Sequence, residues 1–133
     1  MLIPVRHIHR IAVVDDSLAV RDSLKLLLGI HGYDVEAFSG SAGLLASSGL
    51  GAFDCFVIDL KLGGPDGMHL LSSVRARGFL QPAILISGWE AESLERLAAK
   101  AGFASYVRKP MMMTSIVDEI RRVLWPRENR PGD

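Results

Sequence analysis

The sequence predicts one α/β domain in which a five-stranded parallel sheet is covered by helices on both faces. Two patterns predict this fold class: short apolar runs alternate with longer amphipathic segments along the chain, and only short loops separate them. The length of 133 residues suits one domain with its own core. Apolar residues make up 49% and charged residues 23%, which excludes a disordered or low-complexity chain.

The first two strands and the helix between them are predicted from residues 11–38. Residues 11–14 are continuously apolar, which is typical of a strand buried on both faces. Ser17 can cap a helix, and Gly32 is a typical stop signal after it. Residues 33–38 alternate well enough to form the second strand. The apolar stripe of the helix consists of Val20, Leu24, Leu27 and Leu28.

The rest of the chain continues the alternation of strands and helices. A glycine-rich loop at residues 63–67 separates the third strand from its helix. The stripe of the fourth helix includes Leu94, Leu97 and Ala98. We expect strands at 55–58, 83–86 and 104–107, and helices at 40–48, 68–77, 90–101 and from a cap at Thr114 to an end at Pro126.

Five strand–helix pairs of this length fit a flavodoxin-like (βα)5 sheet with strand order 2-1-3-4-5. We divide the chain into an N-terminal lead-in at residues 1–9, a folded domain at 10–125 and a flexible C-terminal tail at 126–133. No internal repeat and no linker to a second domain is evident in the sequence.

Charge and cysteine content narrow the classes of function. Fifteen basic and fifteen acidic residues cancel, so the chain lacks the basic excess of a dedicated nucleic-acid binder. The single cysteine, Cys55, cannot form an internal disulfide. No apolar stretch resembles a signal peptide or reaches membrane-spanning length. We therefore expect a cytoplasmic protein that binds neither nucleic acid nor a membrane.

Polar residues follow four of the predicted strands at the carboxyl edge of the sheet, where open α/β folds bind ligands. Strands 1 and 3 are neighbours in the predicted order, so their acidic residues meet. The crevice would hold three carboxylates, a hydroxyl and an ammonium. These residues are Asp15 and Asp16 after the first strand, Asp59 after the third, Ser87 after the fourth and Lys109 after the fifth.

Electrostatics indicates what this crevice binds. Two like charges about 4 Å apart repel by roughly 4 kcal/mol at an effective dielectric constant of about 20. Three carboxylates beside one lysine therefore need a proton or a cation. Hard oxygen ligands favour Mg²⁺. A metal beside a carboxylate nucleophile, a lysine and a hydroxyl is typical of phosphoryl transfer, although each residue alone also suits a helix start, a turn or the surface.

Several short motifs carry a resemblance to a known family over about residues 9–125. Together they resemble the receiver domain of bacterial two-component response regulators, and residues 19–24 (Ala-Val-Arg-Asp-Ser-Leu) are similar to the nitrogen-fixation regulators of that family. The motifs are Val13-Val14-Asp15-Asp16, Val57-Ile58-Asp59, Gly67, Ile86-Ser87-Gly88 and Tyr106-Val107-Arg108-Lys109-Pro110.

The resemblance implies an acceptor and a metal site. Asp59 would accept a phosphoryl group from a sensor histidine kinase. Asp16 and Asp59, with the backbone carbonyl of Lys61, would ligate Mg²⁺, and Asp15 would act through a metal-bound water.

The resemblance also implies a switch. Lys109 would pair with the phosphoryl oxygens, and Ser87 would donate a hydrogen bond to them. Gly88 and Trp89 would control access to the phosphoryl group. Tyr106 would turn inward when Ser87 moves, which would change the surface of helix 4, strand 5 and helix 5.

We therefore predict a single-domain response regulator that catalyses only its own phosphorylation and dephosphorylation. Its partners would be a histidine kinase, and a histidine phosphotransfer protein or another protein target. Balanced charge and the apolar residues 111–113 permit a homodimer. The alternative is a receiver-fold interaction module that works without phosphorylation, which the unusual Gly63, in place of the family's proline, mildly favours. Two other functions are disfavoured. A related phosphohydrolase would have an acid at the position of Lys61, and a flavin-binding protein would have a hydroxyl-rich first loop in place of Asp15-Asp16.

Overall fold

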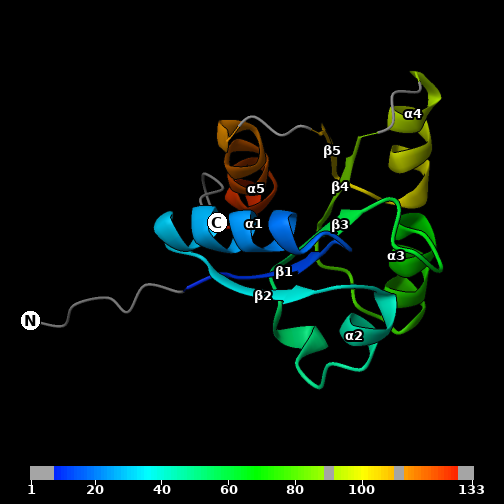
Figure 1. The fold of residues 1–133 in the computed structure, drawn as a ribbon, viewed down its shortest axis with the longest axis horizontal. Coiled ribbons are helices and arrows are strands. Elements are labelled where there is room, and N and C mark those ends of the chain that lie inside the picture. The colour runs from blue at the N-terminus through cyan, green and yellow to red at the C-terminus, as the bar shows by residue number, and fades with distance from the viewer. Residues whose placement is uncertain (1–7, 89–91, 110–112, 129–133) are drawn as a thin grey trace, which may run out of the picture.

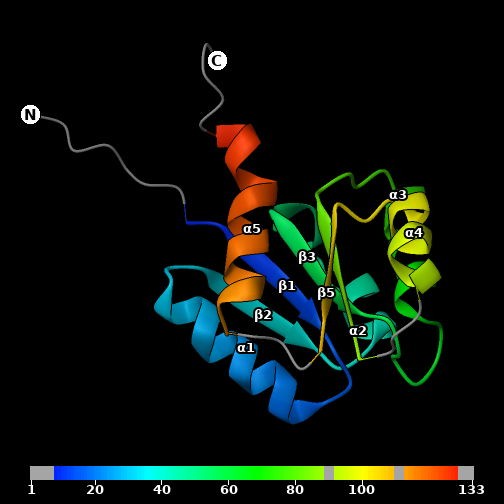
Figure 2. The ribbon, with the colours of Figure 1, turned by 90° about the horizontal axis from the view of Figure 1, so that it is seen from above.

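The structure, a computed structural model, describes residues 8–88, 92–109 and 113–128. Its centre is a parallel sheet in which the strands lie in the order β2-β1-β3-β4-β5, which confirms the predicted topology (Figure 1). In Figure 2 the strands run in one direction and end at the same edge of the sheet. The strands are β1 (Arg10–Val14), β2 (Asp34–Phe38), β3 (Cys55–Asp59), β4 (Ala83–Ser87) and β5 (Ser105–Arg108).

Helices cover both faces of the sheet, as predicted. Figures 1 and 2 show α1 and α5 on one face, and α2, α3 and α4 on the other. No helix in the described ranges is long and apolar enough to cross a bilayer. The helices are α1 (Leu18–Ile30), α2 (Ser41–Leu45), α3 (Gly67–Ala76), α4 (Glu92–Ala101) and α5 (Met113–Glu128), with a short 3₁₀ turn at Leu50–Ala52.

The central strand β3 shows why the apolar runs are continuous. Cys55 and Val57 point into the core beneath α1 and α5, whereas Phe56 and Ile58 point into the core beneath α2, α3 and α4. All four side chains are fully buried. A strand covered on both faces has no solvent side, so polar residues do not alternate along it.

Local signals set the ends of the helices. The hydroxyl of Ser17 accepts a hydrogen bond from the Val20 amide at 3.3 Å, as its predicted cap role requires. Beyond α1, Gly32 has a φ of 90°, which glycine adopts at little cost. Asp66 caps α3 by accepting a 2.9 Å bond from the His69 amide, which the sequence analysis missed.

Four details of the helices differ from the prediction. The helix α2 is shorter than the predicted 40–48, since it spans only Ser41–Leu45. The helix α5 begins at Met113, so Thr114 lies inside its first turn, because a cap-capable residue fixes a boundary only to within one or two positions. It also continues past Pro126 into the predicted tail, because proline within a helix removes one hydrogen bond without having to end it. Leu97 is 48% exposed, since it lies at the edge of a buried stripe that Leu94 and Ala98 define.

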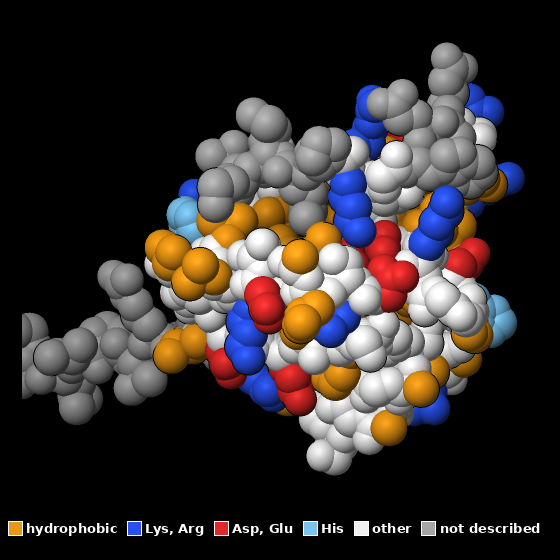
Figure 3. Space-filling model, in the orientation of Figure 1, with side chains coloured by type: hydrophobic (Ala, Val, Ile, Leu, Met, Phe, Trp, Pro, Cys, Tyr) orange, Lys and Arg blue, Asp and Glu red, His pale blue; other side chains and the backbone are white. Residues whose placement is uncertain are grey.

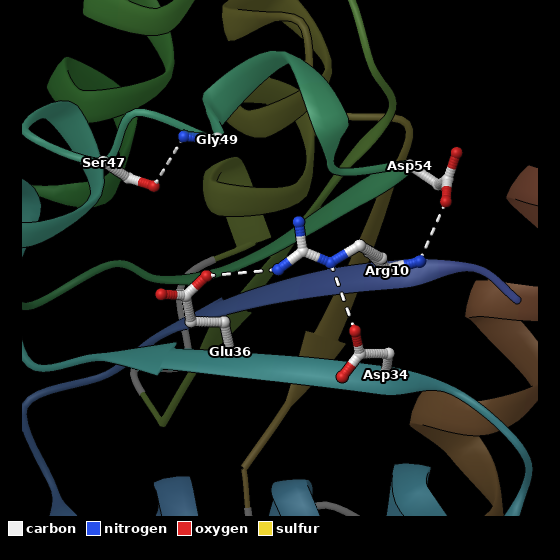
Figure 4. Close-up of polar contacts among 6 residues, drawn as sticks. All are labelled: Arg10, Asp34, Glu36, Ser47, Gly49 and Asp54. Atoms are coloured by element: carbon white, nitrogen blue, oxygen red, sulfur yellow. Dashed lines mark hydrogen bonds and ion pairs between the residues drawn. The ribbon is translucent and has the colours of Figure 1, made fainter.

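One arginine, Arg10, links the amino ends of β1, β2 and β3 (Figure 4). Its guanidinium lies 3.2 Å from the Asp34 carboxylate and 3.4 Å from that of Glu36, both on β2. Its backbone amide donates to the Asp54 carboxylate at 2.8 Å, and its guanidinium carbon lies 4.9 Å from the centre of the Phe53 ring. These contacts tie β1, β2 and the start of β3 at the edge opposite the predicted site.

Candidate functional site

The parallel sheet brings the predicted site residues to one edge. Asp15 and Lys109 directly follow β1 and β5, while Asp59 and Ser87 are the last residues of β3 and β4. Among the described residues, the buried polar side chains are Asp15, Asp59 and Ser87, with exposed fractions of 0%, 5% and 2%. Burying polar groups is costly, so their burial at this edge of an otherwise apolar core indicates a functional site.

The three carboxylates form one cluster. One carboxylate oxygen each from Asp15, Asp16 and Asp59 lies within 4.8 Å of the other two. Asp16 is exposed, so the cluster opens to solvent on one side. In the space-filling view, acidic side chains gather between α1 and α3 with basic side chains beside them (Figure 3).

One lysine lies against two of the three acids. The Lys109 ammonium is 2.8 Å from Asp15 Oδ2 and 3.3 Å from Asp59 Oδ2. Three ionised carboxylates against one ammonium leave an excess of negative charge. At these distances that excess favours binding of a further cation or of a proton.

The pKa values of Asp59 and Lys109 respond to this crowding. Burial raises the pKa of the Asp59 carboxyl above its ordinary value, and the charge of Asp15 raises it further, while Lys109 lowers it by less. Burial lowers the pKa of Lys109, but its hydrogen bond to Asp15 and the charges of both acids outweigh burial and raise it. Lys109 is therefore firmly held in its charged form.

The donor set fits a small hard cation. Asp15 Oδ1 accepts a hydrogen bond from the Ser17 amide at 2.9 Å. The buried Oδ2 lies 2.8 Å from the Lys109 ammonium, which is its partner among the described residues. Three carboxylates within 4.8 Å of one another, one of them exposed, and an excess of negative charge together suit Mg²⁺, which binds one or two carboxylates and keeps several waters.

The start of α3, directly after the loop that follows β3, requires glycine at its first position. A Cβ on Gly67 would lie 2.4 Å from the backbone oxygen of Asp59 and 2.9 Å from a methyl carbon of Ile58. The Gly67 amide donates to the Leu60 carbonyl at 2.8 Å, which draws the start of α3 against the end of β3. Gly67 was predicted only from the family motif, and the structure supplies its physical reason. Lys61 in the same loop is exposed.

The remaining predicted residues lie on β4, β5 and the segments that follow them. The Ser87 carbonyl accepts a hydrogen bond from the Lys109 amide at 2.8 Å, which joins the two strand ends. A Cβ on Gly88 would meet the Lys109 side chain at an ordinary contact distance of 3.7 Å. Tyr106 is half-buried and packs against the core beneath α3 and α4. Trp89 lies outside the described residues.

Arg21 on α1 reaches the site, although no role for it was predicted from the sequence. Its Nη1 donates to the backbone carbonyl of Asp15 at 2.8 Å. The only sequence signal was its place five residues after Asp16, in the first turn of a helix that starts at the site. That spacing does not by itself specify a contact.

A family model described as the response regulator receiver domain matches residues 11–121, which is most of the chain. Among curated relatives, the C4-dicarboxylate transport transcriptional regulatory protein DctR of Rhodobacter capsulatus is 32% identical over 120 residues, which cover 89% of this chain and 61% of DctR. The transcriptional regulatory protein FixJ of Bradyrhizobium diazoefficiens is also 32% identical over 120 residues, covering 87% and 58%. The chain thus spans about three fifths of the length of these relatives.

Solved structures give the same result. A CheY-like response regulator receiver domain protein from Methanospirillum hungatei has a TM-score of 0.82 and 27% identity, covering 92% of this chain and 98% of its own. A response regulator receiver domain protein from Clostridium thermocellum has a TM-score of 0.82 and 25% identity, covering 90% and 97%. This chain therefore belongs to the family of response regulator receiver domains, the regulatory domains of two-component signalling systems.

Proposed function

We propose that this receiver domain accepts a phosphoryl group on Asp59 in an Mg²⁺-dependent reaction. The donor would be the phosphohistidine of a sensor histidine kinase or of a histidine phosphotransfer protein. A carboxylate oxygen of Asp59 would form a bond to phosphorus while the bond from phosphorus to the histidine nitrogen breaks, which leaves a neutral histidine. The observation that carries the proposal is the packing of Asp59 against Asp15, Asp16 and Lys109 at the end of β3.

Asp59 suits the role of acceptor because of its surroundings. Its raised pKa makes the carboxylate a stronger nucleophile than an exposed aspartate, and the Lys109 ammonium at 3.3 Å supports its ionised form. The same ammonium would pair with phosphoryl oxygens as negative charge arrives on Asp59. Lys109 is held in place by its 2.8 Å contact with the fully buried Asp15, so its charge is oriented before the donor binds.

The acids would also hold the metal. Asp16 and Asp59 would be direct ligands with the backbone carbonyl of Lys61, and Asp15 would contribute through a water. Bound Mg²⁺ would supply positive charge that offsets the charge on the phosphoryl oxygens. Asp15 has a second task within the chain itself, because it fixes both Lys109 and, through Oδ1, the Ser17 amide at the start of α1.

Phosphorylation would act as a switch through Ser87 and Tyr106. A phosphoryl group adds about −1.5 to −2 charge and three acceptor oxygens. The Ser87 hydroxyl would donate to one of these oxygens, and its movement would leave space that the half-buried Tyr106 ring fills. Gly88 and Trp89 would govern access of water and donors to the phosphoryl group.

The output surface would be the one around α4, β5 and α5. Tyr106 borders a hollow of about 260 Å³ there, together with Glu95 of α4 and Glu119 of α5. Burial and the charge of Glu95 raise the pKa of the Tyr106 hydroxyl, so the ring remains neutral. Glu119 accepts hydrogen bonds from Ser105 and Arg122, each at 2.8 Å, which fixes the α5 side of the hollow. Rotation of the Tyr106 ring would change the shape of this hollow and hence its affinity for a protein partner or a second copy.

The proposed activity needs only the domain that we assign to residues 10–125. The domain turns over its own phosphoryl group and no other substrate. We infer a cytoplasmic setting, because histidine kinases and phosphotransfer proteins donate phosphoryl groups there. The alternative is an interaction module that never accepts a phosphoryl group, which the loop with Gly63 at a φ of 74° favours.

Phosphorylation in the absence of a kinase tests the proposal. The purified protein is incubated with acetyl phosphate, with Mg²⁺ or with EDTA, and its intact mass is measured. We expect one added phosphoryl group with Mg²⁺ and none with EDTA. Asp59→Asn should abolish the added mass, whereas Asp34→Asn, at the opposite edge of the sheet, should leave it unchanged. Absence of any added mass in the folded wild type would instead support the interaction module.

A further inference from the structure

Arg21, in the family-like run at residues 19–24, contacts the backbone of Asp15 beside the acid cluster. Its side chain extends from α1, and Nη1 of the guanidinium donates a hydrogen bond to the backbone carbonyl of Asp15 at 2.8 Å. Its own backbone amide donates to the Ser17 carbonyl at 3.0 Å, so the residue is anchored in the first turn of the helix. The side chain is half-buried, which limits its freedom to leave the contact.

The carbonyl that Arg21 holds belongs to the peptide between Asp15 and Asp16. A peptide unit is planar, so fixing its oxygen also fixes the direction of the Asp16 N–H and Cα. The Asp15 amide donates to the Phe38 carbonyl at 3.1 Å, and the Asp15 carboxylate accepts from the Ser17 amide at 2.9 Å. These two bonds hold the Asp15 amide and side chain, and the Arg21 bond holds the remaining backbone group, the Asp15 carbonyl, in the peptide that leads to Asp16.

We infer that Arg21 is a positioning residue for the Mg²⁺ site. It orients the Asp15–Asp16 peptide so that the exposed carboxylate of Asp16 converges with Asp59, although Arg21 itself touches neither metal nor phosphoryl group. The inference rests on the metal site of the proposed function. It assigns a specific task to a side chain that the acceptor chemistry leaves without one.

The positive charge of Arg21 and its positioning contact would change Mg²⁺ affinity in opposite directions, which makes the inference testable. A guanidinium near a cation site repels the cation, so its removal would strengthen Mg²⁺ binding if charge were its main influence. Removal of a positioning contact weakens binding instead, and loss of outer contacts of this kind typically costs about 10-fold to 100-fold in metal affinity. The two roles therefore predict changes of opposite sign.

The experiment measures Mg²⁺ affinity by isothermal titration calorimetry without any phosphodonor. Arg21→Ala should weaken binding by about tenfold. Arg21→Lys should stay within about threefold of the wild type, because an ammonium can still donate to one carbonyl. The matched control is Arg77→Ala: Arg77 Nη1 also donates to a backbone carbonyl, that of Leu45, at 2.6 Å and away from the site. This control should leave the affinity unchanged.

A second readout needs no metal. The Ser17 amide bonds to the Asp15 carboxylate, so its hydrogen exchange reports on the order of the β1–α1 connection. We expect Ser17 exchange to be at least about tenfold faster in Arg21→Ala and unchanged in Arg77→Ala.

Unchanged or tighter Mg²⁺ binding by Arg21→Ala would overturn the inference while leaving the proposed function intact. Unchanged Ser17 exchange would overturn it as well. If the wild type binds no Mg²⁺, the metal site of the proposed function fails, and the exchange measurement alone still decides whether Arg21 orders the connection.

Discussion

Replacing Gly67 with alanine should lower the free energy of unfolding by about 2 kcal/mol. The added Cβ would lie 2.4 Å from the Asp59 carbonyl oxygen, far inside contact distance, and the obstructing atom is backbone rather than the end of a flexible side chain. Overpacking of this severity costs about 3 kcal/mol. Alanine in the first turn of α3 returns up to about 1 kcal/mol through its higher helix propensity. The difference gives the expected net loss.

Urea unfolding measures this loss, and a second glycine provides a control of opposite sign. Gly29 lies within α1, and a Cβ there would meet no atom within 4 Å. Gly29→Ala should therefore raise the free energy of unfolding by about 0.5 to 1 kcal/mol. Because the clash at position 67 falls on Asp59 itself, Gly67→Ala should also slow phosphorylation, whereas Gly29→Ala should not. A Gly67→Ala variant as stable as the wild type would refute the close-approach argument.

Three further predictions concern the charges of the site. Asp59→Asn should raise the free energy of unfolding at pH 7, because the pKa of Asp59 in the fold lies above its ordinary value of 3.8 and its ionisation therefore opposes folding. This gain should shrink as the pH falls through the raised pKa of folded Asp59 toward 3.8, and it should vanish below about 4, where the carboxyl is protonated in both states. A constant gain in urea unfolding at all pH values would contradict the reasoning. Mg²⁺ at about ten times its Kd should add about 1.4 kcal/mol to the free energy of unfolding in the same assay. Asp16→Asn should remove this effect. An equal effect in that variant would exclude Asp16 as a ligand. Lys109→Gln should slow acetyl phosphate labelling by about a hundredfold, as judged by intact mass over time, whereas equal rates would show that the ammonium is not used.

The strand order and the layers of helices were predictable from the sequence because burial on both faces leaves a strong pattern. Five apolar runs separated by amphipathic stretches admit few arrangements, and the structure has the expected one. Exact boundaries were less predictable, because they depend on single hydrogen bonds. The continuation of α5 beyond Pro126 and the cap that Asp66 provides are two such cases.

The site was predictable in composition but not in detail. The rule that parallel strands end at one edge placed Asp15, Asp59 and Lys109 together, and the structure has them in contact. The bond from Arg21 to a backbone carbonyl was not predictable, since nothing in the sequence marks which carbonyl a long side chain reaches. The pairing of Arg10 with acids on β2, which are 24 and 26 residues away, depends in the same way on strand register.

The measurement that most directly tests the central claim is the location of the phosphoryl group. The protein is labelled with acetyl phosphate and Mg²⁺ and then treated with borohydride, which reduces an aspartyl phosphate to homoserine. Peptide mapping identifies the converted residue. The account predicts homoserine at position 59 and unmodified aspartate at positions 15 and 16. Conversion at Asp15 or Asp16, or a phosphoryl group that resists borohydride, would contradict it.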